Sequence, residues 1–302
     1  MNEVFPSRSS MAEDGDVNKN LTDLAVIILT FNEEANIAQA LESVIGWAGE
    51  IFVLDSFSTD RTIEITERYP CSVHQNRFEN FANQRNFALN HLPIRSEWIF
   101  FLDADEWLPK DLKTEISDLI VRNPDEIGFY IKRRLIWMGR WIRRGYYPSW
   151  ILRLFRRGHA RCEDRTVNEH LIVSGSIGHL NQFFVHEDRK GVSDWIVKHN
   201  GYAMREALEL IKPIDHGVQE INARFWGTQA ERKRWLRHHV WNRMPPLVRP
   251  IFYFIYRYVL SGGFLDGREA FIYHFLQALW YPMLIDVKYL EVKRANAQKR
   301  EP

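Results

Sequence analysis

"EWIFFLDADEWLP", residues 97–109, places three carboxylates within four positions directly after an apolar run. The run Ile99 to Leu102 is typical of a buried strand, and Asp103, Asp105 and Glu106 follow it. Like charges this close repel one another, and the repulsion grows when water is removed. The cluster therefore lies either in solvent at the end of a strand or beside something cationic.

The chain before this stretch alternates between buried-strand patterns and amphipathic helical patterns. Strand patterns occur at 24–29, 50–55 and 71–76, and helical patterns at 33–48, 58–69 and 81–92. Such alternation predicts a mostly parallel sheet covered by helices, in which 97–106 is the fourth strand. Ser58 or Thr59 is the expected N-cap of the second helix.

The rhythm changes after about residue 127, where short strands and turns replace the strand–helix units. A helix capped by Ser193 is expected next, and helices broken by proline and glycine follow it. We therefore divide the chain into a flexible tail (1–22), an α/β domain (23–215) with halves 23–126 and 127–215, and a helical, aromatic-rich region (216–302).

The net charge of +1 hides a strong division along the chain. Residues 1–130 hold 10 Lys or Arg and 23 Asp or Glu, whereas residues 131–302 hold 30 and 16. The first half is suited to hold a cation, and the second to meet anions such as phosphates or acidic lipids. Two cysteines make no disulfide framework, which favours a reducing compartment.

Polar residues follow all four predicted strands of the first half. They stand in "TFNEE" (30–34), "DSFSTD" (55–60), the loop before "QRN" (84–86) and "DADE" (103–106). Because ligands bind beyond the carboxyl ends of parallel strands, these segments predict one shared site. Taken singly, Asn32 and Ser58 also suit turns or caps, and Asp55 a cap.

Asp103 and Asp105 are spaced to aim two carboxylates at one hard divalent ion, Mg²⁺ or Mn²⁺. Such an ion would relieve their repulsion and bridge the phosphates of a diphosphate. An isolated Asp-x-Asp is common by chance, so the interpretation depends on its place after an apolar strand.

"VIILTFNEEANIAQALESV", "VLDSFSTDRTIEI", "NQRNFAL" and "WIFFLDADE", in this order and spacing, resemble the nucleotide-sugar-binding half of family 2 glycosyltransferases. The resemblance covers roughly residues 24–110. It implies an inverting enzyme with the GT-A fold, a Rossmann-like and mostly parallel sheet flanked by helices, here with a helical carboxyl-terminal extension. The remainder, with "VNEHL" and "HED", is similar to bacterial enzymes that extend lipopolysaccharide core.

The resemblance also implies roles for individual residues. The donor site would contain Thr30, Asn32, Glu33, Asp55, Ser58, Arg85 and Asp103. Thr30 and Glu33 would contact the base and ribose, and Asp55 would accept from the uracil N3–H of a UDP-sugar. Many members carry a second Asp where this chain has Ser56. Arg85 would bind the nucleotide or diphosphate, Asp103 would lie near the ribose, and Asp105 would bind the metal.

An inverting transfer needs a base to take the proton of the acceptor hydroxyl. Glu169 matches the family position, and Glu163 and Asp164 are rivals because many members carry the base in a Glu-Asp pair. His186 could bind the metal or the leaving diphosphate, although lone histidines often have structural roles.

Basic and aromatic residues are interleaved over 132–165. No recognised nucleic-acid module accompanies them, so a phosphorylated lipid or sugar acceptor, or a solvated basic face, is favoured over nucleic acid. The aromatic segments 250–260 and 270–285 suit helices lying in a membrane interface, or helices packed on the core, and no segment is apolar enough to span a membrane.

These observations predict transfer of a sugar to a lipid-linked bacterial glycan, by a protein located in the cytoplasm and peripheral at the inner face of the cytoplasmic membrane. Two rival functions remain at this stage. One is a polyprenyl-phosphate glycosyltransferase, whose ionised acceptor needs no strong base. The other is a non-catalytic nucleotide-sugar-binding scaffold.

Overall fold

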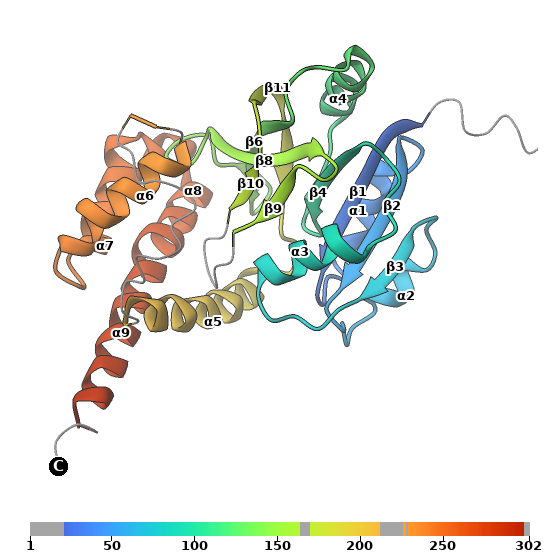
Figure 1. Cartoon of the computed structure of the whole chain (residues 1–302). Coiled ribbons are helices and arrows are strands. Elements are labelled where there is room, and N and C mark those ends of the chain that lie inside the picture. Colours follow the sequence, from blue (N-terminus) through green and yellow to red (C-terminus); the bar gives the residue numbers. More distant parts are fainter. Residues whose placement is uncertain (1–20, 164–169, 212–225, 228, 299–302) are drawn as a thin grey trace, which may run out of the picture.

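A computed structural model describes residues 21–163, 170–211, 226–227 and 229–298 (Figure 1). Its centre is a nine-stranded sheet with the order β3-β2-β1-β4-β8-β6-β11-β5, in which β7 pairs with β6. The first half of the chain contributes β1 (Thr22–Thr30), β2 (Ala48–Asp55), β3 (Ser72–Gln75), β4 (Trp98–Asp103) and β5 (Glu106–Trp107). The strands β1 to β4 run parallel, as the alternating pattern predicted.

The register of these strands brings their carboxyl ends to one edge. Thr30 pairs with Asp55, Asp55 pairs with Gln75, and Leu29 pairs with Asp103. The polar residues that end β1, β2 and β4 are therefore neighbours across the sheet. This placement is what the sequence predicted for a site beyond parallel strands.

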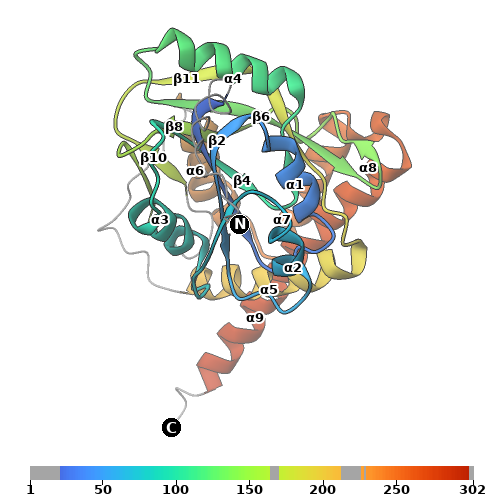
Figure 2. The ribbon, with the colours of Figure 1, turned by 90° about the vertical axis from the view of Figure 1, so that its right-hand side faces the viewer.

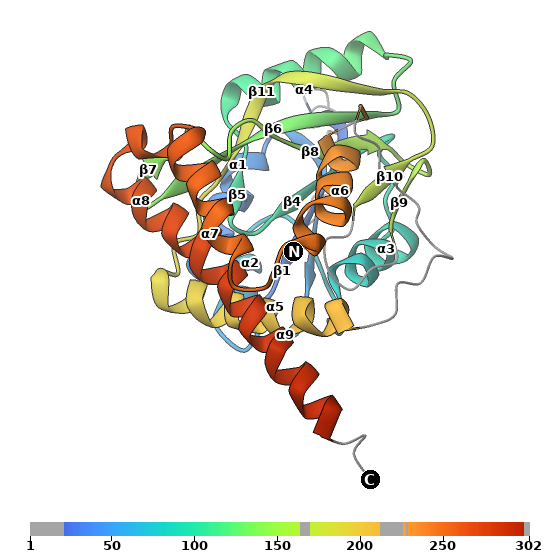
Figure 3. The same cartoon turned by 90° about the vertical axis from the view of Figure 1, so that its left-hand side faces the viewer.

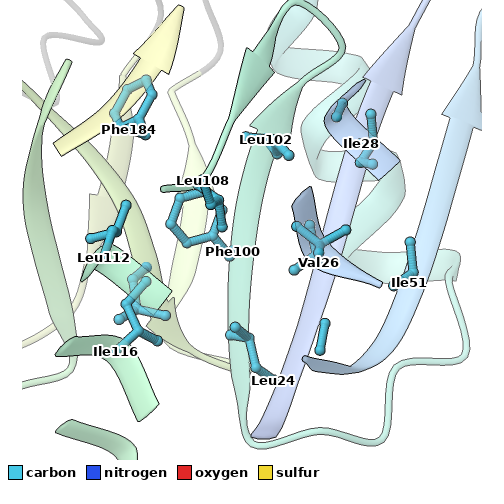
Figure 4. Close-up of a cluster of buried hydrophobic side chains, with 14 of the residues drawn as sticks. Leu24, Val26, Ile28, Ile51, Phe100, Leu102, Leu108, Leu112, Ile116 and Phe184 are labelled. Carbon is cyan, nitrogen blue, oxygen red and sulfur yellow. The ribbon is translucent and has the colours of Figure 1, made fainter. Parts of the chain in front are cut away.

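Alternate residues of the central strands enter two separate cores. On one face, Leu24, Val26 and Ile28 of β1 pack with Phe100 and Leu102 of β4 (Figure 4). The helices α1 (Ile37–Val44) and α4 (Lys110–Arg122) cover this face. On the other face, Ile27 and Phe101 pack against α3 (Phe81–His91). Burial on both faces explains why these strands are apolar throughout.

The second half extends the same sheet with antiparallel pairs. Its strands are β6 (Gly128–Trp137), β7 (Arg140–Trp141), β8 (Ser149–Arg156) and β11 (Ile177–His186). β8 lies antiparallel between β4 and β6, and β11 runs parallel to β6. A separate hairpin joins β9 (Ala160–Cys162) to β10 (Leu171–Val173).

Helices follow β11. They are α5 (Val192–Ile211), α6 (Gln229–His239), α7 (Arg249–Phe254), α8 (Arg268–His274) and α9 (Tyr281–Gln298), with short 3-10 or π segments η1 (Trp241–Arg243), η2 (Ile255–Leu260), η3 (Gly263–Asp266) and η4 (Phe275–Trp280). A third apolar cluster joins them to the sheet, where Trp137 of β6 contacts Trp195 and Tyr273. The far end of α9 projects from the body of the molecule (Figures 2 and 3).

Some of the expected aromatic surface is thus packed and some is not. Ala270, Tyr273 and His274 are buried, whereas Phe252, Leu260 and Leu265 are more than half exposed. Within the described residues, no helix combines the length and apolarity needed to cross a membrane.

Two predicted helix starts were wrong. The helix α2 (Thr62–Thr66) begins after Arg61, so neither Ser58 nor Thr59 is its N-cap. The reason is that Ser58 is hydrogen bonded to Asp55 in the preceding turn, and Asp60 accepts the Thr62 N–H instead. The helix α5 begins at Val192, one residue before the predicted cap Ser193.

The Glu50 carboxylate connects the start of β2 to the segment before β4. Its Oε2 accepts hydrogen bonds from the backbone N–H groups of Arg95 and Ser96 and from the Ser96 hydroxyl, at 2.9, 2.7 and 2.8 Å. Burial by itself raises the pKa of Glu50, but these hydrogen bonds outweigh it and the net pKa lies below the ordinary 4.5. Glu50 therefore stabilises the fold when it is ionised.

We expect Glu50→Gln to lower the free energy of unfolding by about 1 kcal/mol at pH 7, measured by urea denaturation. Because the pKa is depressed in the folded state, this difference should be complete above the unfolded pKa and shrink as the pH falls toward about 3. Glu67→Gln, at an exposed position, serves as the control. A deficit that is constant or grows on acidification would contradict the role given to Glu50.

Candidate functional site

The ends of β1 and β2 carry two buried polar side chains. The Thr30 hydroxyl has no hydrogen-bond partner among the described residues, although Thr30 is only 4% exposed. Asp55 is fully buried, and its carboxylate accepts from the Ser58 N–H at 2.9 Å, the Ser58 hydroxyl and the Gln75 side-chain amide at 3.0 Å. A carboxylate can accept about four hydrogen bonds, so Asp55 retains capacity for a ligand donor.

Asn32 and Ser58 connect the loops that follow β1 and β2. The Asn32 N–H donates to the Ser58 hydroxyl at 2.8 Å, and Asn32 Oδ1 accepts from the Thr59 N–H at 2.7 Å. Asn32 adopts a left-handed backbone with φ of 52°, which asparagine tolerates better than most residues. Asn32 and Ser58 therefore have the turn roles that the sequence allowed, and their hydrogen bonds hold the two loops together.

Glu33 points inward and is held by the segment after β11. Its oxygens accept from Lys190 Nζ at 2.6 Å and from the Asn36 amide at 2.7 Å, and its N–H donates to the Thr62 hydroxyl at 2.7 Å. Burial and the nearby Asp105 charge raise the pKa of Glu33, while Lys190 opposes them. Glu33 therefore connects the loop after β1 to the segment after β11.

The three residues of the "QRN" motif on α3 contact three different parts of the site. Gln84 donates to the Ser56 hydroxyl at 3.0 Å. Arg85 lies 3.5 Å from Asp103 Oδ1. Asn86 exchanges two hydrogen bonds with the backbone of Cys162 in β9, at 2.8 and 3.1 Å. α3 therefore connects the loop after β2 and the acidic motif after β4 to the β9–β10 hairpin.

The acidic motif after β4 is neutralised by side chains of the chain itself. The buried Arg153 of β8 donates to Asp103 Oδ2 and to Glu106 Oε1, both at 2.6 Å. The other Glu106 oxygen accepts the Asp103 N–H at 3.0 Å. Burial alone raises the pKa of Asp103, but Arg153 and Arg85 outweigh it and lower the pKa to about 2. For Glu106 burial dominates and raises the pKa, with Arg153 opposing it.

The sequence suggests that Glu106 only begins the turn after the acidic motif, and the structure differs. Glu106 is buried and belongs to the short strand β5, which pairs with the end of β11. Arg153 explains the difference because a buried guanidinium needs more than one carboxylate to satisfy its donors.

Asp105 faces two further cations. His186 Nδ1 lies 3.4 Å from its Oδ1, and Lys198 Nζ of α5 lies 3.8 Å from its Oδ2. Burial alone raises the pKa of Asp105, but His186 and Lys198 outweigh it and hold the pKa far below its usual range. Conversely, burial lowers the pKa of His186, and Asp105 more than compensates, so the net pKa is raised. Asp105 is an ionised carboxylate at neutral pH.

Asp105 and His186 fit a divalent metal ion, although the described residues contain no cluster of three or more His, Cys, Asp or Glu arranged to hold one. Adjacent ligands of an octahedral ion with bonds of about 2.1 Å lie about 3 Å apart, close to the 3.4 Å between Asp105 Oδ1 and His186 Nδ1. Moreover, His186 Nδ1 is buried without a hydrogen-bond partner among the described residues. Mg²⁺ commonly takes one or two protein ligands and fills the rest with water and phosphate.

Asp103 fits the metal less well than the sequence predicted. Its two oxygens already face Arg85 and Arg153. An ion at Asp103 would have to displace a guanidinium. An ion at Asp105 would displace only a proton of His186 or the more distant ammonium of Lys198. The structure therefore separates the two aspartates by their partners.

The candidate bases fall largely outside the described residues, because Asp164 and Glu169 both lie in the segment 164–169. Glu163 is described. It is buried, and its Oε2 lies 3.9 Å from His170 Nδ1. Its neighbour Cys162 is the residue that Asn86 holds. The structure thus connects the start of this segment to α3.

Four charged residues of the site escaped sequence reasoning. Arg153 was one basic residue among many in the segment 132–165, and Glu106 was seen but had no role. Lys190 and Lys198 stand in helix-like or loop patterns that carry no signal of a site. All four are recognisable only through partners that are distant in the sequence.

Comparison with known proteins places the chain in a family. The sequence model of the family described as glycosyl transferase family 2 matches residues 25–178. The lipopolysaccharide core biosynthesis glycosyltransferase LpsC of Rhizobium meliloti is 28% identical over 274 residues, which cover 84% of this chain and 90% of that protein. An uncharacterized glycosyltransferase of Rickettsia conorii is 28% identical over 209 residues, covering 65% and 73%.

A solved structure with a similar fold is the mannosyltransferase PcManGT of Pyrobaculum calidifontis, in complex with GDP-Man and Mn²⁺. The TM-score is 0.50 and the identity 16%, and the alignment covers 90% of this chain and 88% of that one. The likeness concerns the fold, and it agrees with the sheet order and flanking helices described above. The family match spans half of the chain, and the protein is therefore a family 2 glycosyltransferase with a GT-A fold and a helical carboxyl-terminal extension.

Proposed function

We propose that this glycosyltransferase moves a sugar, with inversion, from a nucleoside diphosphate donor to a hydroxyl group of a lipid-linked bacterial glycan such as lipopolysaccharide core. The observation that carries the proposal is the convergence of Thr30, Asp55, Arg85 and Asp105 at one edge of the sheet. The likeness to LpsC supports the acceptor class.

In this proposal the donor is a UDP-sugar. The unpartnered Thr30 hydroxyl and the buried Asp55 carboxylate offer polar contacts to the base and ribose, and Asp55 can accept the uracil N3–H. Asn32 and Ser58 shape this part of the site through their turn contacts, and Glu33 is held there by Lys190. Arg85, next to Asp103, presents a fork suited to phosphate oxygens.

A divalent ion, Mg²⁺ or Mn²⁺, would be held by Asp105 and His186, with Asp103 beside it. When bound, it would stabilise the negative charge that develops on the leaving diphosphate. The crystals of PcManGT with GDP-Man and Mn²⁺ are consistent with a donor and ion of this kind.

The acceptor hydroxyl must lose a proton as it attacks the anomeric carbon. We assign this proton to Glu169, with Asp164 and Glu163 as rivals. The connection of Cys162 to α3 supports a base in this part of the chain because it links the start of the segment to the donor side.

A lipid-linked acceptor calls for contact with the membrane surface, and we propose that the protein lies at the inner face of the cytoplasmic membrane. Ile251, Phe252, Tyr256, Val259, Leu260, Phe264 and Leu265 are exposed on α7, η2 and η3. Arg144 and Arg268, near the same surface, carry half-exposed or exposed guanidinium groups. Exposed aromatic and aliphatic side chains flanked by arginine suit an anionic bilayer interface.

We expect Asp105→Asn to reduce turnover by at least about 100-fold, because an amide would hold the metal ion less well, and that ion would stabilise the charge that develops on the diphosphate. The assay is donor hydrolysis and transfer with a panel of nucleotide sugars and Mn²⁺. Asp118→Asn, at an exposed position of α4, should have wild-type activity. Activity of Asp105→Asn within threefold of wild type would refute the role of the motif.

Thr30→Val tests the donor pocket separately. Because the Thr30 hydroxyl has no hydrogen-bond partner in the part of the chain that the structure describes, its removal should leave the stability unchanged or raised, yet weaken UDP binding about fivefold in calorimetry. Thr66→Val is the matched control, because the Thr66 hydroxyl donates to the Thr62 carbonyl at 2.7 Å. It should lower stability by about 1 kcal/mol without affecting UDP. Unchanged UDP binding in Thr30→Val would remove Thr30 from the site.

Vesicle flotation tests the membrane contact. The wild type should bind vesicles that contain phosphatidylglycerol, and the double variant Leu260→Ser, Leu265→Ser should bind several-fold less. Val121→Ser on α4 is the control, since Val121 is 85% exposed and α4 lies apart from α7 in Figures 1 and 3. Equal binding by all three proteins would contradict the proposed surface.

A further inference from the structure

Three side chains in a row on one face of α5, a helix outside the sheet, border the site. Lys198, Tyr202 and Arg205 have the spacing i, i+4, i+7 and therefore share a face of the helix. The Tyr202 ring lies 6.3 Å from Phe81 at the start of α3, and the Arg205 guanidinium lies 5.7 Å from the Phe78 ring. Figure 1 shows α5 next to α3.

Lys198 is the member of this row that reaches the acidic motif. At 3.8 Å from Asp105 Oδ2, its ammonium is attracted by the carboxylate but too far away for a hydrogen bond. Its side chain is 35% exposed, whereas that of Asp105 is 8% exposed, so Lys198 borders solvent more than the carboxylate that it faces. An ammonium has three N–H donors, and the contact with Asp105 leaves them available for another acceptor.

Lys190 shows what a structural lysine in the same region looks like. It donates to Glu33 Oε1 at 2.6 Å and contacts the Asn32 carbonyl at 3.3 Å, and its side chain is less exposed. Both contacts have hydrogen-bond length and join two segments of the fold. Lys198 differs because the carboxylate that it faces, Asp105, also suits a metal ion.

We propose that Lys198 binds the diphosphate of the donor, and that it rests against Asp105 in the absence of the donor. The inference depends on the proposed function, because it assumes a nucleoside diphosphate sugar. Because two cations at one carboxylate repel each other, the Lys198 ammonium would be held less well by an Asp105 that bound a metal ion, and would favour contact with a nearby anion. The donor supplies that anion as phosphate oxygens.

The role in the reaction follows from the charge balance. The acceptor oxygen forms a bond to the anomeric carbon and gives its proton to the carboxylate base. The bond from that carbon to the diphosphate oxygen breaks, and the electron pair stays on the diphosphate. Lys198 remains protonated throughout, and its N–H groups stabilise the charge that the diphosphate gains.

The test compares Lys198→Met, which keeps the length but removes the charge, with Lys198→Arg, which keeps the charge. Calorimetry measures the affinities for UDP and uridine, with Mg²⁺ and with EDTA. We expect Lys198→Met to weaken UDP binding about tenfold, with uridine unchanged, and Lys198→Arg to recover most of the affinity. Lys288→Met is the control, because Lys288 also contacts α5, through the Asn200 carbonyl, and should bind both ligands normally.

A second measurement separates a charge effect from a distorted site. Titration with Mn²⁺ alone should show equal or higher affinity in Lys198→Met, because a cation that competes for Asp105 has been removed. If the wild type binds UDP and Lys198→Met binds it equally, the assignment of Lys198 is overturned. The same holds if uridine and Mn²⁺ binding weaken along with UDP. If the wild type binds no nucleoside diphosphate, the proposed function itself fails, and the inference with it.

Discussion

Arg153 is the residue on which the geometry of the site depends. Its buried guanidinium holds Asp103 and Glu106 together, each at 2.6 Å, where two carboxylates would otherwise repel. The cost of burying these charges is offset only while all three are present, so loss of one partner would leave an uncompensated charge in the core. By binding Asp103 and Glu106, Arg153 also fixes the turn between them. Asp105, within that turn, is buried and faces His186 and Lys198 instead.

The other carboxylates of the site also face basic side chains of the protein. Asp103 has guanidinium partners, Glu33 has Lys190, and Asp105 has an imidazole and an ammonium. The guanidinium and Lys190 contacts include short hydrogen bonds, whereas the two partners of Asp105 are at 3.4 and 3.8 Å. Asp105 is therefore the carboxylate whose own partners are most easily displaced, and for this reason we propose it as the position of a metal ion.

Sequence patterns predicted the fold of the first half well, because burial on both faces leaves a direct mark on β1 and β4 as continuous apolar runs. They also predicted that the residues ending β1, β2 and β4 would be neighbours, since that follows from parallel pairing alone. Helix starts were less accurate. Ser58 is a plausible N-cap from the sequence, but in the structure its N–H donates to the carboxylate of Asp55, three residues earlier.

The sequence by itself determined the family, the parallel half of the sheet and the set of polar strand ends, because each depends on local spacing or on the order of segments. Only the tertiary structure decided how the charges are shared. Arg153 is 50 residues from Asp103, and Lys198 comes from a helix beyond the last strand of the sheet. An ion pair depends on the distance between two atoms in space. Neither hydrophobic periodicity nor a local motif in the sequence predicts which distant cation lies beside a given carboxylate.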